Sequence, residues 1–191
     1  MAMINERKTE KIVRNMLSSA GYDSKDIIIE EQASENPSIS KLLKNASKKG
    51  VGVGRPEFII RSSKKPNFLI VIECKADEGK HESVSRDKYA EYAVDGVLLY
   101  TSFLAKEYDV LAIAVSGETK SKLKVSHFIH PKEAPSCGEY FKNIRANKYR
   151  YSYGRQANRT LRAIMVPSRD SIPSWVYSSL ERVCGQAKAT F

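Results

Sequence analysis

The chain has 191 residues, 32 of them Lys or Arg and 22 Asp or Glu, for a formal net charge of +10, and 41% are hydrophobic. This length and composition predict a globular protein of one ordinary domain and exclude a large multidomain assembly. No apolar run approaches the roughly 18 residues that span a bilayer, so we expect no membrane association. The N-terminal residues lack the apolar segment of a secretory signal, and three widely spaced cysteines imply no disulfide framework, which together favour a cytoplasmic protein.

The first half of the chain carries the patterns of two helices and three strands. Apolar residues recur at helical spacing over residues 5–20, and a second helix-like segment covers 38–47. A short strand is expected at 26–31. Strand-forming residues also fill 57–61 and 67–73, and the short polar link between them predicts a β-hairpin. Because its residues are apolar on both faces, the last of these strands should lie inside a sheet that is covered on each side.

Three glycines, Gly50, Gly52 and Gly54, separate the second helix from the hairpin. Their spacing superficially resembles a phosphate-binding loop, but no apolar strand precedes them and no Gly-Lys-Ser/Thr ending follows. We therefore interpret this segment as a flexible loop.

The second half predicts one long helix followed by two strands. The helix should cover 87–107, and Asp95 can be interpreted either as a buried helix acid near a functional site or as a break in the helix at Asp95-Gly96. A buried strand is expected at 109–116 and a half-exposed strand at 122–130. This order of helices and strands is typical of an α/β fold.

Most of the excess positive charge lies near the C-terminus. Residues 1–139 have a net charge of +2, whereas residues 140–191 have a net charge of +8. The second region also shows weak helical patterns at 155–165 and 173–183. We therefore expect a folded core over 1–139 and a basic, partly helical extension over 140–191.

The extension has the composition of a nucleic-acid-binding segment. Between Tyr140 and Arg169 no acidic residue occurs, and tyrosines are interleaved with the basic residues. Basic side chains neutralise phosphates and aromatic rings offer stacking surfaces, which makes nucleic acid the expected partner. The alternatives are a solvated basic surface and a face that packs on another domain. The residues expected to contact DNA are Arg55, Lys142, Arg145, Lys148, Arg150 and Arg155.

The hairpin carries the residues with the clearest chemistry. Glu73, Cys74 and Lys75 directly follow the buried strand, and in a strand Glu73 and Lys75 share one face while Cys74 points to the other, as a small core residue. A hairpin folded about Lys65 places Glu57 opposite Glu73. Directly opposed Cβ atoms lie roughly 4.5–5.5 Å apart, so both carboxylates can reach one cation.

Such a cluster of oxygen atoms favours a hard metal ion. Two carboxylates and the backbone carbonyl of Cys74 suit Mg2+, for which Mn2+ can substitute. A metal there polarises a phosphate and lowers the pKa of a bound water, while a neighbouring lysine stabilises developing charge. The residues therefore predict phosphodiester hydrolysis. The plainer alternative is an exposed ion pair at a strand end, worth only about 0–1 kcal/mol.

These residues resemble the PD-(D/E)xK nuclease superfamily, in which a metal-binding acid follows a proline and a second acid stands two residues before a lysine. Here Pro56-Glu57 is followed, sixteen positions after that glutamate, by Glu73-Cys74-Lys75. One residue departs from the pattern, since Glu57 stands where Asp is usual. The resemblance implies a restriction-endonuclease-like αβββαβ core with a central mixed sheet flanked by helices, in which 26–31 supplies the strand that the other patterns leave out.

Longer segments resemble one branch of that superfamily. Residues 41–50, 54–60, 72–76 and 92–100 are similar to the N-terminal endonuclease module of type I restriction subunits and of fused type IIG restriction-methylation enzymes. The resemblance covers about residues 5–130. It implies Mg2+-dependent cleavage of double-stranded DNA in a restriction-modification system, methyltransferase and target-recognition domains missing from this chain, and a transient dimer for cutting both strands.

Carried over residue by residue, the resemblance makes Glu57 and Glu73 metal ligands, Lys75 the catalytic lysine, and Cys74 a ligand through its carbonyl. Glu10 would match the acid that many members place on the first helix, next to the metal. Glu6, one turn earlier on the same stripe of that helix, stays open as an alternative. The Gln that some relatives carry on the later helix has no counterpart here.

Other residue patterns favour plainer interpretations. His127, His130 and Cys137 suggest zinc, but the two histidines would point to opposite faces of a strand, so we interpret them as ordinary strand and loop residues. Two further functions stay open. One is a repair or junction-resolving nuclease of the same superfamily, and the other is a non-catalytic nuclease-like fold that binds DNA or a partner domain through 140–169.

Overall fold

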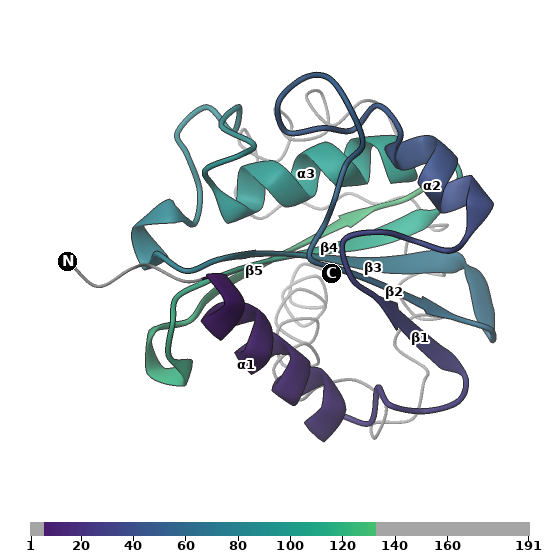
Figure 1. The fold of residues 1–191 in the computed structure, drawn as a ribbon, viewed down its shortest axis with the longest axis horizontal. Helices are drawn as coiled ribbons and strands as arrows, with labels where there is room; N and C mark the ends of the chain where they lie inside the picture. The colour runs from purple at the N-terminus through teal and green to yellow at the C-terminus, as the bar shows by residue number, and fades with distance from the viewer. Residues whose placement is uncertain (1–5, 133–191) are drawn as a thin grey trace, which may run out of the picture.

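The structure, a computed structural model, describes residues 6–132 of the chain. Over this range, one mixed sheet of five strands is flanked by helices (Figure 1), which confirms the predicted α/β class. The helices are α1 (Glu6–Ser19), α2 (Pro37–Leu43) and α3 (Ala93–Leu104), with short 3-10 turns η1 (Glu78–Lys80) and η2 (Lys120–Lys122). The strands are β1 (Ile27–Glu30), β2 (Phe58–Ser62), β3 (Lys65–Lys75), β4 (Asp109–Ser116) and β5 (Lys124–His130).

The strand order β1-β2-β3-β4-β5 places β3 at the centre of the sheet. β1, β2 and β3 pair antiparallel in succession, β3 and β4 are parallel, and β5 is antiparallel to β4. A parallel pair needs a crossover connection, which the segment containing α3 provides. The predicted strand at 26–31 is confirmed as β1, so three antiparallel strands precede the crossover.

Helices cover both faces of the sheet (Figure 1), with α1 on one face and α2 and α3 on the other. On the α1 face, Val13 packs in one buried cluster with Ile72 and Cys74 of β3. On the opposite face, Val97 of α3 packs in a second cluster with Val71 of β3. Successive residues of β3 thus enter two separate cores, which confirms that β3 is an interior strand covered on both sides.

The first turn of α1 is fixed to the ends of two central strands. Thr9 is fully buried, and its hydroxyl donates to the carbonyls of Gly117 at 2.9 Å and Lys75 at 3.3 Å. The N–H of Gly117 donates to the same Lys75 carbonyl at 3.0 Å. These hydrogen bonds hold Glu6 and Glu10 of α1 beside the C-terminal end of β3.

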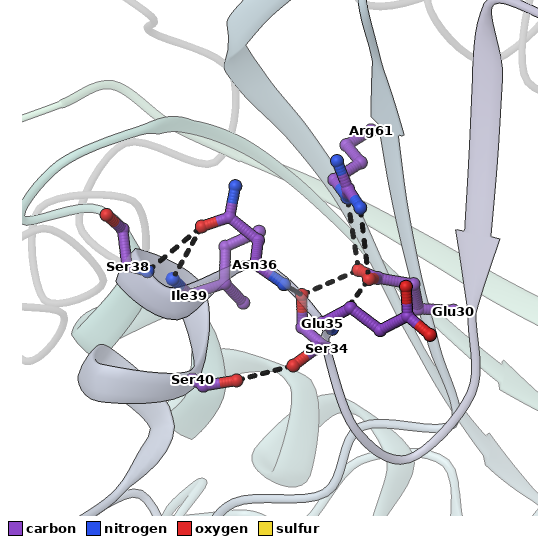
Figure 2. Close-up of polar contacts among 8 residues, drawn as sticks. All are labelled: Glu30, Ser34, Glu35, Asn36, Ser38, Ile39, Ser40 and Arg61. Atoms are coloured by element: carbon purple, nitrogen blue, oxygen red, sulfur yellow. Dashed lines mark hydrogen bonds and ion pairs between the residues drawn. The ribbon is translucent and has the colours of Figure 1, made fainter.

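A buried carboxylate links β1 to β2 and to the chain leading into α2 (Figure 2). Glu30 accepts hydrogen bonds from Nε and Nη2 of Arg61, both at 3.3 Å, from the Ser34 hydroxyl at 2.6 Å and from the Glu35 backbone N–H at 2.8 Å. Burial alone would raise the pKa of Glu30, but these hydrogen bonds and the positive charge of Arg61 lower it. Glu30 therefore fixes the direction in which the chain leaves β1.

Asn36 then begins α2 as its N-cap. The Asn36 side chain accepts from the backbone N–H groups of Ser38 at 3.0 Å and Ile39 at 3.3 Å (Figure 2), and Pro37 occupies the first helical position. The helix ends at Leu43, earlier than the predicted boundary at residue 47. The reason is that the Leu43 carbonyl accepts from Gly54 at 2.8 Å as well as from the turn after the helix, so the following loop returns to the helix end.

The helix predicted over 87–107 is shorter than expected, because α3 begins only at residue 93. Asp95 is fully buried and accepts hydrogen bonds from the backbone N–H of Ser83 at 3.1 Å, from the Ser83 hydroxyl and from the backbone N–H of Lys88 at 2.9 Å. These bonds hold 83–88 in a folded loop. Asp95 is thus a buried acid inside the helix, and the interpretation as a helix break is wrong.

We expect Asp95→Asn to lower the free energy of unfolding by about 1–3 kcal/mol, because the new amide presents a donor to a backbone N–H or a hydroxyl. Urea unfolding of the parent and the variant measures this difference. Glu107→Gln, which removes a carboxylate from an exposed position after α3, is the control and should stay within about 0.5 kcal/mol of the parent. An equal effect of both substitutions would contradict a special role for Asp95.

Some of the other predicted segments lie within the described residues, and the rest lie outside them. The strands expected at 109–116 and 122–130 are confirmed as β4 and β5. The boundary at 139 and the helices expected at 155–165 and 173–183 lie outside the described residues. Among the helices within residues 6–132, none has the length and apolar character needed to cross a membrane.

Candidate active site

The register of the β2–β3 hairpin brings two glutamates together. Phe58, the first residue of β2, pairs with Ile72 of β3, so Glu57 and Glu73 both lie directly beyond this last pair of the ladder. This is the register predicted from the length of the hairpin, although a bulge at Arg61/Ser62 shortens the turn itself. Both glutamates therefore lie where β2 begins and β3 approaches its end.

Glu73 is fully buried and its carboxylate contacts two ammonium groups. Nζ of Lys75 lies 3.4 Å from Oε1 of Glu73, and Nζ of Lys48, from the loop after α2, donates to the same oxygen. The second oxygen, Oε2, has no hydrogen-bond partner among residues 6–132. Burial raises the pKa of Glu73, and the two lysines oppose that rise only in part.

Lys75 connects Glu73 to the first helix. Its side chain is 9% exposed, and its Nζ lies 2.9 Å from Oε1 of Glu6. Glu10, one turn further along α1, is close enough to Glu57 to raise the pKa of that carboxyl. Of the two alternatives for a first-helix acid, Glu6 contacts the lysine and Glu10 acts on Glu57, so both border the site.

The pKa of Glu57 is strongly shifted by its surroundings in the site. Burial, followed by the negative charges of Glu73 and Glu10, raises the pKa of Glu57 to about 7. Carboxylates that crowd one region cannot all ionise freely without a compensating cation. Shifts of this kind are frequent at functional sites, and here the shift reflects first the burial of Glu57 and then the negative charges beside it at the end of the hairpin.

Helix α3 closes the site from the side. A Cβ on Gly96 would lie 2.9 Å from the Tyr89 carbonyl oxygen and 3.3 Å from Cγ of Glu73, so glycine at this position lets the helix pack closely against both. One turn later, burial and the charge of Glu73 raise the pKa of Tyr100. The Tyr100 phenol accepts the backbone N–H of Arg55, and Nζ of Lys48 lies 5.5 Å from the centre of its ring. Tyr100 therefore supports the loop that carries Lys48.

The donor set fits a magnesium ion held by few protein ligands. No group of three or more His, Cys, Asp or Glu side chains within residues 6–132 is arranged to hold a metal. Mg2+, however, commonly takes one or two carboxylates and completes its shell with water and substrate phosphates. The buried Oε2 of Glu73, which has no hydrogen-bond partner among residues 6–132, and the raised pKa of Glu57 agree with two carboxylates that could hold such an ion.

The structure describes only some of the other predicted site residues. The Cys74 side chain is buried on the α1 face, as expected, and the role of its carbonyl stays a prediction. Arg55 is exposed on the loop next to Tyr100. The remaining residues expected to contact DNA lie outside the described residues, namely Lys142, Arg145, Lys148, Arg150 and Arg155.

The histidines of the described residues serve the packing of strands and loops. His127 and His130 lie on β5 opposite Ile113 and Val110 of β4, which confirms the expected strand placement, and Cys137 lies outside the described residues. His81 lies between two serine hydroxyls, with Nδ1 2.8 Å from Ser116 Oγ and Nε2 2.9 Å from Ser126 Oγ. His81 thereby fastens the segment before α3 onto β4 and β5.

Lys48 is the site residue that the sequence analysis missed. It belongs to a run, Lys48-Lys49-Gly50, that stands between the helix-like segment predicted at 38–47 and the flexible loop predicted from Gly50 to Gly54. The available signal was indirect: a carboxylate at the end of a fully apolar strand needs more than one compensating charge. Nothing in the local pattern distinguishes Lys48 from its exposed neighbour Lys49.

Comparisons with protein-family models, with curated proteins and with solved structures find no significant match to this chain. The functional assignment therefore rests on the residues of the site and on the fold that brings them together.

Proposed function

We propose that this chain is a Mg2+-dependent DNA endonuclease with a PD-(D/E)xK active site, the cleavage module of a restriction-modification enzyme. The observation that carries the proposal is the placement of Glu57 and Glu73 at facing ends of two paired strands, with Lys75 two residues beyond Glu73. Buried charges at such a position are costly to maintain for stability alone. Their presence at this position therefore favours a functional role.

The order of elements supports the same proposal. The succession α1, β1, β2, β3, α3 and β4 agrees with the αβββαβ core that the resemblance implies, with α2 and β5 as additions. Within that order, the candidate site lies at the hairpin β2–β3, where the superfamily places its two acids and its lysine. The agreement extends to the first helix, since α1 brings Glu6 to Lys75.

The residues of the site suggest a division of tasks in phosphodiester hydrolysis. Glu57 and Glu73 would hold the ion, and a bound Mg2+ would supply Lewis-acid polarisation of the phosphate. Lys75, held between Glu73 and Glu6, would place a fixed positive charge next to the ion. From there it can orient the attacking water or stabilise charge on the phosphate. Glu6 acts as a positioning residue, because it contacts the lysine.

The proposal is tested by cleavage of supercoiled plasmid with the full 191-residue chain at low salt. Nicked or linear product is expected with Mg2+ or Mn2+ and none with EDTA, because cutting depends on the metal. Faster cutting of branched than of duplex DNA would favour a junction-resolving nuclease. DNA binding that EDTA leaves unchanged, with no cutting under any condition, would contradict the proposal and favour a non-catalytic binding module.

A further inference from the structure

The loop between α2 and β2 delivers a second lysine to the buried carboxylate. Lys48 donates to Oε1 of Glu73, and its side chain is 17% exposed, so it approaches the buried carboxylate from near the protein surface. The aromatic ring of Tyr100 lies beneath it, with 5.5 Å between Nζ and the ring centre. The ammonium group thus pairs with a carboxylate that is also expected to hold a metal.

Hydrogen bonds and close packing fix the backbone of the loop that carries Lys48. The N–H groups of Ala46 and Gly54 both donate to the Leu43 carbonyl, at 3.0 Å and 2.8 Å. A Cβ on Gly54 would lie 2.7 Å from the Ala46 carbonyl oxygen and 2.9 Å from Cε1 of Tyr100, so only glycine allows the loop to close this tightly. The loop therefore presents Lys48 to Glu73 in a defined geometry.

The charges around Glu73 show why the carboxylate needs this lysine. Glu73 is fully buried, where an uncompensated negative charge is strongly unfavourable. Lys75 alone is an incomplete counter-charge, because its ammonium group is shared with Glu6. Lys48 supplies the additional positive charge. A divalent cation held by Glu57 and Glu73 would supply the same compensation and would repel a lysine a few ångströms away.

We propose that Lys48 is the internal counter-cation of Glu73 in the metal-free protein and that a divalent metal ion displaces it from the carboxylate. The inference rests on the proposed function, because it takes Glu57 and Glu73 as the metal site. Displacement couples the site to the loop that carries Lys48. By thermodynamic linkage, the interaction of Lys48 with Glu73 weakens metal binding by the same factor by which a bound metal weakens that interaction.

Metal affinity tests the coupling directly. Mn2+ titration of the full chain, followed by electron paramagnetic resonance, is performed for the parent, Lys48→Met and Lys49→Met. Lys48→Met is expected to bind Mn2+ about tenfold more tightly than the parent, since the competing cation is gone. Lys49→Met removes the same charge one residue away, at an exposed position, and should bind as the parent does.

Amine reactivity of the unaltered protein tests the displacement and does not depend on the folding of a variant. Acetylation of Lys48 by an amine-reactive ester, measured by peptide mass spectrometry, should increase when Mg2+ is added. Lys49 serves as the internal control, because its side chain is already exposed and should react equally in both conditions.

The outcomes separate this inference from the proposed function. If the parent and both variants bind no Mn2+, the metal site itself is wrong. If the parent binds Mn2+ but Lys48→Met binds it equally or more weakly, the function stands and the competition is refuted. Tighter binding with no increase in Lys48 acetylation would also overturn the proposal, because Lys48 would then stay on Glu73 while the metal is bound.

Discussion

Glu73→Gln is expected to reduce metal-dependent plasmid cleavage by at least about 100-fold, since loss of a group that merely orients a metal ligand already costs up to about that factor. The substitution keeps the shape of the side chain and removes its charge. Glu73 is fully buried and contacts both Lys48 and Lys75, so an amide there lacks the negative charge that pairs with both lysines and would hold the proposed cation.

The same variant should fold, which makes the loss of activity interpretable. Removal of one partner from a fully buried ion pair costs roughly 3–5 kcal/mol. Here the cost should be smaller, because Lys75 keeps Glu6 at 2.9 Å and Lys48 is near enough to the surface to reach water. Glu73→Ala is a poorer choice, since it adds a cavity next to Gly96. Urea unfolding of the parent and the variant checks this expectation.

Glu91→Gln is the matched control for Glu73→Gln. Glu91 also pairs with a lysine, Lys80 at 3.0 Å, but both side chains are largely exposed and lie outside the cluster of carboxylates. This substitution should leave cleavage and stability close to the parent values. Cleavage by Glu73→Gln at the rate of the parent would show that the hairpin carboxylates do not form the active site.

The register of the hairpin could be predicted because it depends on a strict period. Strand residues alternate between faces, so a buried strand ending at Glu73 and a short turn leave few ways to pair it. The structure has Phe58 opposite Ile72, the pairing that brings Glu57 to Glu73. The same alternation correctly separated Cys74 from the two charged residues beside it.

The contribution of Lys48 could not be predicted, because it depends on contacts between distant segments. The loop reaches Glu73 only after Gly54 has packed against Tyr100 and the chain has returned to the end of α2. Each of these contacts joins residues that no helical or strand period relates. The sequence therefore indicated a loop only at the glycines that follow Lys48, and only the folded chain shows that Lys48 reaches the site.

The start of α3 could not be predicted for a similar reason. The residues before position 93 have helical spacing, yet Ser83 and Lys88 donate to Asp95 and fold into a loop instead. A buried carboxylate that accepts several hydrogen bonds outweighs the weak preference of a few residues for a helix. Tertiary hydrogen bonds of this kind override the local preference for a helix.

Glu57→Gln is expected to remove a pH dependence of stability that the metal-free parent should show between about pH 4.5 and 7. The pKa of Glu57 is raised from 4.5 to about 7 in the folded protein, so over this range the folded state keeps a proton that the unfolded state has released. The stability of the parent therefore falls as the pH rises through this window, and below pH 4.5 this contribution no longer changes. Glutamine resembles the protonated acid.

Chemical denaturation of the parent and of Glu57→Gln at pH 5 and pH 8 in EDTA measures this difference. The two proteins should be similar at pH 5, whereas at pH 8 the variant should be more stable by about 1–2 kcal/mol, after allowance for solvent screening at a partly open site. Mg2+ should stabilise the parent at pH 8 and leave the variant nearly unchanged, because an ion that binds only the folded state shifts the equilibrium toward it. Glu107→Gln, at an exposed position, is the control and should follow the parent at both pH values. Parallel pH profiles for the parent and Glu57→Gln would contradict the raised pKa of Glu57, which comes from its burial and from the carboxylates around it, and with it this reason to expect a cation there.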